Sequence, residues 1–401
     1  MKNDFHLLIV GAGIAGLTVA ALLAQSRVSE RLKITLLDAQ QRPSRPAGED
    51  VALRVSAIAT GSSHLLDRIG AWSCLDAGRV APYNCMRVWD ESSTVESGDA
   101  LVFEAAEFAV PQLGFIVENV HLQAALLDVL QRARVEVLFA SPIAALQLQQ
   151  PGVLVRLEDG RTLQADLVIG ADGARSKVRE SADIESEKWA YGQSAFVTHL
   201  RPERPHCNTA WQRFLRKGPL GMLPLYDGRI SVVWSTTDEQ AQWAMQASDE
   251  ALAQALTAAS DHVLGKLTVA GARAVFPLQA RHARDYVKTG LALIGDAAHA
   301  VHPLAGQGAN LGLQDAACLA DVLAEAIQNG EYPGDRPVLR RFERSRKGAN
   351  ASMMHFMTGL NRLFTTDSAL LKELRTTGMR LFNNSGPVRE HVVGVALGTR
   401  R

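Results

Sequence analysis

The sequence has few cysteines and no excess of charge of either sign. Its four cysteines form no C-x-x-C pair, so neither a zinc site nor a disulfide framework is predicted, and a reducing cytoplasm fits best. They are Cys74, Cys85, Cys207 and Cys318. The 42 basic residues equal the 42 acidic residues, which leaves no net field to attract nucleic acid or an anionic bilayer over long range. A polyanion-binding role is therefore disfavoured.

Long hydrophobic runs are also scarce. Residues 7–24 form the one apolar stretch about long enough to span a bilayer, and three glycines interrupt it. Because these glycines have a mechanical explanation of their own, the stretch indicates neither a signal peptide nor a transmembrane helix. With 401 residues, 47% of them hydrophobic and 21% charged, the chain is otherwise typical of a globular protein of two or three domains.

The first glycine motif follows a short apolar run. Residues 6–10 (HLLIV) are typical of a buried parallel strand, and they lead directly into Gly11-Ala12-Gly13-Ile14-Ala15-Gly16 and a helix-forming segment, residues 17–25. In a G-x-G-x-x-G turn, the first glycine permits the turn, the second lets the backbone approach a pyrophosphate, and the third lets helix and strand pack closely. The phosphates would lie at the helix N-terminus.

Asp38 strengthens this interpretation. It ends the next predicted strand, residues 33–37 (KITLL), and lies 22 residues after Gly16. An acid at the end of the second strand binds a ribose hydroxyl in dinucleotide-binding folds. The two features together predict an adenine dinucleotide site. The alternative is a glycine-rich turn in an unrelated α/β protein, with Asp38 as a solvated charge.

Two further motifs favour FAD over NAD, because an NAD dehydrogenase would carry the first motif alone. Residues 165–169 form another apolar strand pattern, followed by GADGARS (170–176), in which Asp172 can accept hydrogen bonds beside a ligand. A third strand, beginning at residue 291, ends in Gly295-Asp296, where a carboxylate can hold ribityl hydroxyls.

A glycine-rich loop, Pro303 to Asn310, then opens a predicted helix over residues 311–327. Its backbone N–H groups could face the electron-rich pyrimidine edge of a flavin, aided by the helix dipole. Such a site would stabilise reduced, anionic flavin. The loop contributes Gly306, Gln307, Gly308, Ala309 and Asn310.

Three segments resemble, in order, the signatures of the FAD-dependent aromatic hydroxylases related to para-hydroxybenzoate hydroxylase: GAGIAG, GADGARSKVR and GDAAHAVHPLAGQGANLG. Within that group, the chain is similar to the ubiquinone-biosynthesis hydroxylases in RVSAI (54–58), GFIVEN (114–119), VFPL (275–278) and HPLAGQGANLGLQDA. The resemblance implies an α/β fold, α+β overall. It has a Rossmann-like FAD-binding domain of the glutathione-reductase type, an inserted antiparallel-sheet substrate domain and a C-terminal helical segment.

The resemblance also implies roles for the matching residues. The pyrophosphate would be bound by Gly11, Ala12, Gly13, Ile14, Ala15 and Gly16. Asp38 would bind the adenosine ribose, at a position where the family more often has Glu. Asp172 would lie near the pyrophosphate, and Gly295 with Asp296 would lie at the ribityl chain.

Three more positions carry over from the family. Arg54 resembles an arginine whose side chain lies near the flavin and the pyrophosphate. Asn119 stands where many relatives carry Arg or Gln, so its contact stays open. Pro303 resembles the residue whose backbone carbonyl sits near the substrate and the reactive flavin face. No acid or base side chain is assigned as catalytic, because a phenolic ring is already activated.

Two histidines and a basic cluster have ordinary explanations. His299 and His302 lack a third ligand nearby, so no metal site is predicted. His299 is expected to be a packing and hydrogen-bonding residue, and His302 to lie near the flavin without being catalytic. A basic cluster on a predicted helix is expected to be a solvated face, although a polyprenyl substrate would let it, or the amphipathic C-terminal segment, touch a membrane. The cluster is Arg340, Arg341, Arg344, Arg346 and Lys347.

The three motifs must meet at one ligand, so the FAD-binding domain is predicted to be noncontiguous. Its expected pieces are residues 1–75, 101–185 and 275–360. Residues 76–100 and 186–274 are expected to form the substrate-binding sheet, since alternating apolar patterns flank a Tyr226-Asp227-Gly228 turn. Residues 361–401 are expected to be a helical segment that becomes irregular around residues 383–387.

The family implies a reaction in which NADH or NADPH reduces FAD, O₂ adds to give a C4a-hydroperoxyflavin, and its distal oxygen attacks an electron-rich ring. The expected substrate is a polyprenylated phenol or benzoquinol intermediate of ubiquinone biosynthesis, and VEN (117–119) with W-Q-x-F (211–214) favours demethoxyubiquinol. The alternatives are another small phenol, a flavin oxidase or reductase without oxygen insertion, or an FAD-binding scaffold. We expect a cytoplasmic homo-oligomer that binds no nucleic acid, with a ubiquinone-biosynthesis assembly and the inner face of the membrane as candidate partners.

Overall fold

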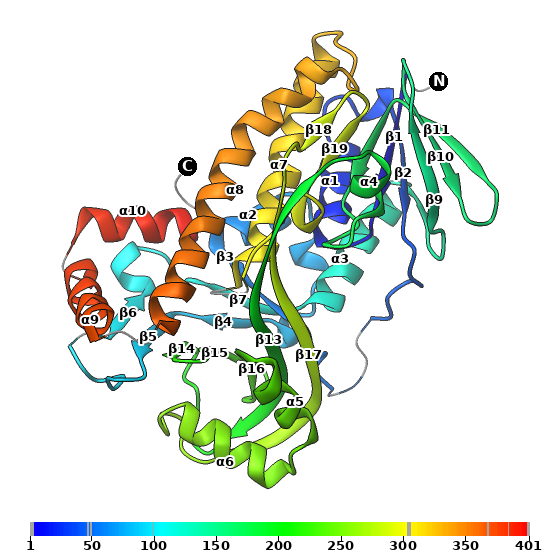
Figure 1. The fold of residues 1–401 in the computed structure, drawn as a ribbon. Helices are drawn as coiled ribbons and strands as arrows, with labels where there is room; N and C mark the ends of the chain where they lie inside the picture. Colours follow the sequence, from blue (N-terminus) through cyan, green and yellow to red (C-terminus); the bar gives the residue numbers. More distant parts are fainter. Residues whose placement is uncertain are drawn as a thin grey trace.

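The computed structural model describes residues 4–45, 48, 50–98, 100–302, 306–366, 369–383 and 385–398. Two large sheets divide it: a six-stranded sheet with its helices in the upper part of Figure 1, and an eight-stranded sheet below. Two long strands, β13 (Ser186–Pro202) and β17 (Leu267–Ala283), run between the two parts.

The six-stranded sheet is built from short, continuously apolar strands, as expected for a sheet covered on both faces. Its order is β18-β19-β12-β1-β2-β8, and all pairs are parallel except β18 with β19. The bounds are β1 (Phe5–Val10), β2 (Leu32–Leu37), β8 (Glu136–Leu138), β12 (Leu167–Gly170), β18 (Val287–Lys288) and β19 (Leu291–Leu293). The strands predicted at residues 6–10, 33–37, 165–169 and from 291 are therefore confirmed to within a few residues.

Helices α1 (Ile14–Ala24), α3 (Asn119–Arg132) and α7 (Gln307–Gln328) pack in this part, and α1 has no charged residue because it is covered almost all round. Smaller elements complete it. They are the sheet β9 (Ile143–Leu148), β10 (Val153–Leu157) and β11 (Thr162–Ala165), the sheet β3 (Val55–Ala59), β7 (Gly114–Glu118) and β4 (Ala81–Tyr83), and helices α2 (Thr60–Arg68) and α4 (Lys177–Ser181). Short 3-10 helices are η1 (Ser29–Arg31), η2 (Trp72–Cys74), η3 (Ala77–Arg79), η4 (Ala105–Phe108) and η5 (Gly295–Ala297).

The eight-stranded sheet has the order β20-β17-β13-β16-β15-β14-β5-β6. Besides β13 and β17 it contains β5 (Cys85–Asp90), β6 (Leu101–Glu104), β14 (Thr209–Leu215), β15 (Gly218–Pro224), β16 (Ile230–Thr237) and β20 (His299–Ala300). The hairpin predicted around residues 226–228 is the antiparallel pair β15–β16. Residues 101–104 and 275–283, which the predicted division places in the FAD-binding part, belong to strands of this sheet.

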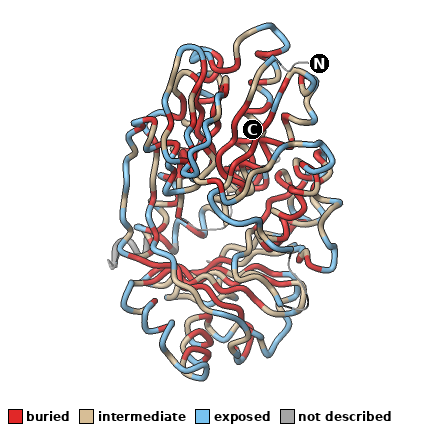
Figure 2. The backbone as a smooth tube through the Cα atoms, turned by 90° about the vertical axis from the view of Figure 1, so that its right-hand side faces the viewer, coloured by how far each residue is buried: buried red, intermediate tan, exposed pale blue. Residues whose placement is uncertain are grey.

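Each large sheet has its own hydrophobic core, and Figure 2 shows buried backbone in both halves of the molecule. In the lower half, alternate residues of β13, β15 and β16 pack against α5 (Asp238–Gln246) and α6 (Asp249–Ala259). Because these helices cover one face of the sheet, the opposite face is left for the upper part and for the C-terminal helices.

The C-terminal helices are α8 (Arg336–Thr365), α9 (Ala369–Asn383) and α10 (Pro387–Ala396). The long α8 packs on α7 and ends over β14, where the rings of Phe214 and Phe364 stack with centroids 3.9 Å apart. Two residues of the stretch expected to be irregular, 383–387, are helical: Asn383 ends α9 and Pro387 begins α10. None of the described helices is both long and apolar enough to cross a membrane.

Candidate active site

The first glycine motif, Asp38, Asp172 and Asp296 follow the carboxyl ends of four neighbouring strands, β1, β2, β12 and β19. Backbone hydrogen bonds join the loops there: Gly11 N donates to Leu37 O at 2.7 Å, and Ala171 N donates to Val10 O at 2.7 Å. The carboxyl edge of a parallel sheet is where such folds bind ligands. The structure thus brings the three motifs and Asp38 together at one edge.

The glycines of the first motif serve different purposes. Gly11 has a φ of +112°, and a Cβ there would lie 2.3 Å from Ala171 O. A Cβ on Gly16 would lie 2.0 Å from Gly11 O, so neither position accepts a side chain. At Gly13, which caps the N-terminus of α1, a Cβ would meet nothing within 4 Å. The open space therefore lies in front of Gly13, where a pyrophosphate would meet the helix N-terminus.

Asp38 is held firmly by backbone groups. Its Oδ2 accepts from Ala12 N at 2.6 Å and its Oδ1 accepts from Gln40 N at 2.7 Å. Each carboxylate oxygen keeps a further lone pair, so hydroxyl donors can still bind. The geometry fits a ribose-binding acid beside the glycine turn.

Asp172 is engaged within its own loop. Its Oδ2 accepts from Lys177 N at 2.7 Å and from Val178 N at 3.1 Å, which caps α4, and its Oδ1 is buried without a hydrogen-bond partner in the described part of the chain. Burial raises the pKa of this carboxyl group, and the hydrogen bonds from the α4 N-terminus oppose the rise. A contact between Asp172 and a ligand stays a prediction.

Gly295 and Asp296 form the start of η5, directly after β19. Gly295 has a φ of +57°, and its Cα lies against Gly312 of α7 and Ala15 of α1. Desolvation by surrounding protein raises the pKa of Asp296, and the nearby His299 and, to a smaller extent, Arg54 oppose the rise. Its side chain is nevertheless exposed. This carboxylate is therefore open to a ligand.

A buried ionic network supports this turn, and the sequence analysis did not predict it. Asp315 of α7 is fully buried; its Oδ2 accepts from His299 Nε2 at 2.5 Å and Gly295 N at 3.1 Å, while its Oδ1 accepts from Arg346 Nε at 2.8 Å. Burial opposes ionisation, but the interactions with His299 and Arg346 outweigh it and lower the pKa of Asp315 to about 2. Asn350 donates to the same carboxylate at 3.0 Å.

The network overturns one expectation. Arg346 belongs to the basic cluster predicted to be a solvated helix face, yet its side chain is only 12% exposed and also donates to Gln314. The reason is that α8 packs on α7, so this side of the helix faces the protein. Arg341 instead pairs with Glu331 near the surface. His299 is the hydrogen-bonding residue expected from the sequence.

The glycine-rich loop is described from Gly306 onward, so Pro303 lies outside the described residues. Gly306 has a φ of +63° and caps the N-terminus of α7, while the next four residues form the first turn of the helix rather than a loop. They are Gln307, Gly308, Ala309 and Asn310. Space in front of Gly308 is open. Asn310 is buried; its Oδ1 accepts from Ala59 N and its Nδ2 donates to Ala57 O, both at 2.9 Å. Its side chain fastens α7 to β3, leaving the backbone of the turn to meet a ligand.

Arg54 and Asn119 are neighbours. Asn119 N donates to Arg54 O at 3.0 Å, and Asn119 Oδ1 accepts from Ser56 Oγ at 2.7 Å. The exposed Arg54 side chain lies over the ring of Phe276, with 5.7 Å between Cζ and the centroid. Arg54 is near enough to Asp296 to oppose the rise in the pKa of that carboxyl group. A contact of Arg54 or Asn119 with a ligand stays a prediction.

His302 is buried, and neither ring nitrogen has a hydrogen-bond partner among the described residues. Burial lowers its pKa to about 4, so the ring is neutral at pH 7. Across the residues that the structure describes, no three His, Cys, Asp or Glu side chains converge as metal ligands would.

The arrangement fits FAD as a cofactor. Open backbone at Gly13 and Gly308 marks two places where a bound molecule can approach helix N-termini, and exposed Asp296 lies on the strand-end edge between the motifs. A pyrophosphate suits the first terminus and a flavin pyrimidine edge the second. The sequence motifs predict these residues. Asp315 also lies in a quoted motif, HPLAGQGANLGLQDA, but the motif gives no sign of its ionic partners, and Arg346 belongs to no motif.

Comparisons with known proteins agree with this site. A family model described as an FAD-binding domain matches residues 4–356. The chain is 36% identical to the ubiquinone biosynthesis monooxygenase COQ6 of Danio rerio, with 98% of this chain and 89% of that protein covered. It is 35% identical to the 3-demethoxyubiquinol 3-hydroxylase of Escherichia coli, with 98% of each covered, and 37% identical to the ubiquinone hydroxylase UbiL of Rhodospirillum rubrum, with 98% and 89% covered.

Solved structures share the fold. PqsL of Pseudomonas aeruginosa has a TM-score of 0.75 at 22% identity, covering 94% of this chain and 99% of that one. The p-nitrophenol 4-monooxygenase PnpA of Pseudomonas putida has a TM-score of 0.77 at 17% identity, with 100% of both chains covered. At these identities the likeness shows the fold, and it confirms the predicted fold class.

Proposed function

We propose a function for this chain on the premise that it belongs to the FAD-dependent aromatic hydroxylases and, within them, to the ubiquinone-biosynthesis hydroxylases. It hydroxylates the aromatic ring of a polyprenylated phenol or benzoquinol, using FAD, O₂ and NADH or NADPH. The observation that carries the proposal is the meeting of three motifs at the carboxyl ends of adjacent strands, with open backbone at Gly13 and Gly308. The 3-demethoxyubiquinol named for the Escherichia coli relative is the first substrate to test.

In this proposal each motif binds a different part of FAD. The pyrophosphate meets the N-terminus of α1 at Gly13, with Asp38 on the adenosine ribose. Asp296 holds the ribityl hydroxyls, and Arg54 lies beside it on the flavin side. The N–H groups in the first turn of α7, around Gly308, stabilise negative charge on the reduced ring system. The backbone carbonyl of Pro303 near the substrate stays part of the proposal.

The protein's chemical contribution is to orient and to exclude water. When bound and reduced, FAD supplies the activation of O₂ that inserts one oxygen atom into the ring. The eight-stranded sheet has one face covered by α5 and α6, and its other face turns toward the upper part, where it can enclose the ring. Enclosure protects activated oxygen from decay to peroxide. An electron-rich ring needs no side-chain base, and none is assigned.

Analysis of quinone lipids in a deletion strain tests the substrate. The proposal expects a ubiquinone precursor lacking one ring hydroxyl to accumulate, and its identity names the ring position. Complementation by the intact gene should restore ubiquinone, and complementation by the Gly13→Ala variant should not. An unchanged quinone profile would instead direct attention to another small phenol.

A flavin oxidase, a reductase or a scaffold would behave differently in the purified protein. Anaerobic reduction with NADH or NADPH followed by a pulse of O₂ should give hydroxylated substrate. Reduction that yields only hydrogen peroxide in the presence of substrate would indicate an oxidase. A yellow protein that consumes no nucleotide, with or without substrate, would indicate a scaffold.

A further inference from the structure

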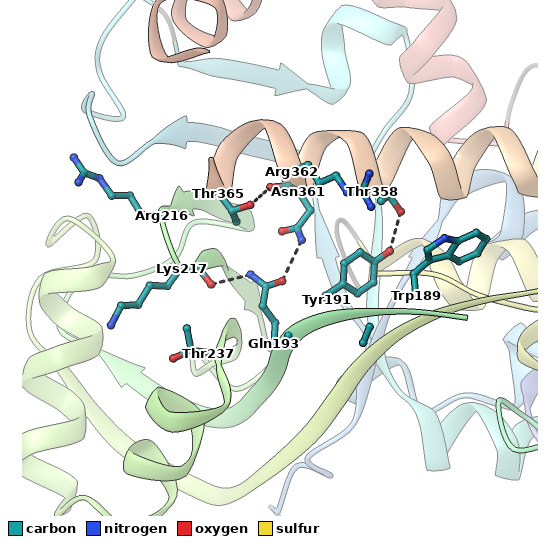
Figure 3. Close-up of a pocket in the computed structure, with 12 residues that line it drawn as sticks. Trp189, Tyr191, Gln193, Arg216, Lys217, Thr237, Thr358, Asn361, Arg362 and Thr365 are labelled. Carbon is teal, nitrogen blue, oxygen red and sulfur yellow. Dashed lines mark hydrogen bonds between the residues drawn. The ribbon is translucent and has the colours of Figure 1, made fainter. Parts of the chain in front are cut away.

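A cavity of about 330 Å³ lies away from the strand-end motifs, between the C-terminal end of α8 and the sheet. Figure 3 shows its walls: residues 189–193 of β13, the turn between β14 and β15, and residues 358–365 of α8. Nothing in the FAD site described above uses these residues.

A buried amide pair forms part of the lining. Asn361 is 4% exposed, and its Nδ2 donates to Gln193 Oε1 at 3.1 Å. Gln193 Nε2 in turn donates to Lys217 O at 2.8 Å. These bonds leave Asn361 Oδ1 buried with no donor from the described residues. Since a buried acceptor without a partner is costly, the cavity is suited to a ligand that carries an N–H or O–H donor.

The lining has a strongly one-sided charge. It contains Arg216, Lys217 and Arg362 but no carboxylate. Arg216 forms an ion pair with Glu91, its Nε 2.9 Å from Oε1. Lys217 and Arg362 are exposed and contact no carboxylate within the described ranges, so both are available to an anion. The chain has no net charge, whereas all the charged residues that line this cavity are basic. This lining favours a phosphate-bearing ligand over a polyprenyl tail.

The other end of the cavity is aromatic and approaches the proposed flavin site. Trp189 and Tyr191 line it, and Tyr191 Oη lies 2.9 Å from Thr358 Oγ1. The Tyr191 ring packs edge-on against His302, with centroids 4.9 Å apart. An aromatic ligand held against Tyr191 would therefore lie one side chain, that of His302, away from the backbone of the third motif.

We propose that this cavity is the binding site of the reduced pyridine nucleotide. Lys217 and Arg362 bind its phosphates, Trp189 and Tyr191 pack on the dihydronicotinamide ring, and Asn361 Oδ1 accepts from the carboxamide. The inference rests on the proposed function, which needs a two-electron donor. Because the sequence shows no second dinucleotide-binding motif, that donor must bind elsewhere on the chain. Because hydride transfer needs direct contact, the flavin ring and the dihydronicotinamide must come together past the His302 side chain in the reduction step. The hydride then passes to FAD, which becomes the reduced flavin, and the nucleotide leaves oxidised.

The test compares the double variant Lys217→Ala with Arg362→Ala to a control carrying Lys266→Ala with Arg344→Ala. The control removes two exposed cations outside the cavity and changes the net charge equally. In anaerobic stopped-flow reduction of the holoenzyme, the cavity variant should raise the apparent Kd of NADH or NADPH about tenfold or more. Its limiting reduction rate, FAD content and thermal stability should match the wild type, as should the control throughout.

Direct binding provides a readout that does not depend on flavin chemistry. Titration of NADH or NADPH should quench tryptophan fluorescence by energy transfer. Trp189→Phe should reduce the quenching, and Trp189→Ala should also raise the Kd measured by calorimetry because it removes a ring that packs on the nucleotide. Asn361→Leu should weaken binding about tenfold, since one hydrogen bond to the nucleotide is lost.

The outcomes separate this inference from the proposed function. If either nucleotide reduces the wild-type flavin but all variants share its Kd, the site assignment is overturned and the function stands. If neither nucleotide reduces the flavin yet the cavity variant alone loses nucleotide binding, the site stands and the function fails. If the cavity variant loses only binding to vesicles of phosphatidylcholine with phosphatidylglycerol, the cations serve a membrane and the inference is overturned.

Discussion

At the scale of single residues, two glycines of the first motif have different roles: one permits close packing and the other leaves space for a ligand. Gly16 keeps α1 in contact with the turn, because a Cβ there would lie 2.0 Å from Gly11 O. Gly13 faces open space and has an ordinary φ of −73°. We expect Gly13→Ala to leave the thermal stability of the apoprotein unchanged but to weaken FAD binding about tenfold or more, by displacing the pyrophosphate. FAD titration and thermal melts of the apoprotein measure these effects, and unimpaired FAD binding by Gly13→Ala would refute the placement of the pyrophosphate at Gly13.

We expect Gly16→Ala to fail to fold, which a thermal melt of the apoprotein would show as the absence of a cooperative transition.

Asp315 carries the buried ionic network. Removing its charge leaves Arg346 without an anion, so Asp315→Asn should lower the free energy of unfolding by about 3–5 kcal/mol. Urea unfolding of the apoprotein measures this. The matched control is Glu331→Gln, whose partner Arg341 is more exposed, and it should change stability by less than about 1 kcal/mol. Equal effects of the two substitutions would contradict the role given to the network.

Burial lowers the pKa of six of the described histidines, three of them to about 4, and this makes stability depend on pH. Burial is the main reason that the pKa of His199, His282 and His302 falls to about 4, from an ordinary value of 6.5. The unfolded chain therefore binds more protons than the folded chain between these values, and stability is lost as pH falls from about 6.5 to about 4.

The loss amounts to at most about 1.4 kcal/mol per pH unit for each histidine. Denaturant unfolding at pH 7, 6 and 5 should show it. His302→Leu should flatten the dependence, whereas the exposed His391→Leu should not. A slope unchanged by His302→Leu would show that this ring is not held neutral.

At the scale of elements, strands were easier to predict than helix starts. The four strands of the nucleotide edge are marked by apolar runs that stop at glycine or aspartate. The start of α7 was placed at Leu311, but the helix begins at Gln307. Glycines at 306 and 308 indicate a loop locally, and the helix extends through them because Asn310 fastens this turn to β3.

The contacts that sequence could not show are long-range. His299 and Asp315 are separated by 16 residues, and Asp315 and Arg346 by 31. A basic cluster on one helix does not reveal which of its sides packs, so Arg346 resembled its solvated neighbours. The cavity beside α8 has the same origin, since β13, the β14–β15 turn and α8 meet only in the folded chain.

One crossing of elements is tight enough to test. Gly312 of α7 lies where α1 and η5 meet, and a Cβ there would be 3.3 Å from Ala15 Cβ and 3.6 Å from Gly295 Cα. A larger side chain must push α7 away from α1. We expect Gly312→Leu to lower stability by about 1–3 kcal/mol and to weaken FAD binding, because both proposed phosphate and flavin contacts depend on this crossing. Thermal melts and FAD titration measure the two effects. A stable variant with normal FAD affinity would contradict the role given to this crossing of α7 with α1 and η5.

At the scale of the whole molecule, the fold separates cofactor binding from substrate enclosure. The upper sheet supplies the FAD edge, the lower sheet supplies a broad surface, and β13, β17 and α8 connect them. Fold class and cofactor followed from motifs because phosphate and flavin binding constrain short local sequences. The substrate surface and the cavity could not be predicted from motifs. The alternating apolar residues of a β-sheet occur in many proteins, so they do not indicate what the sheet binds. The predicted division into domains stays a prediction, with β6 and the end of β17 as the places to examine.

Oxygen transfer from O₂ to the aromatic ring is the central claim, and isotope labelling measures it most directly. The holoenzyme, given NADH or NADPH and a short-chain demethoxyubiquinol under ¹⁸O₂, should yield a hydroxylated product that carries one ¹⁸O atom. In H₂¹⁸O with ordinary O₂, the new hydroxyl should be unlabelled. Nucleotide oxidation that gives only labelled hydrogen peroxide, or a product labelled from water, would contradict the account.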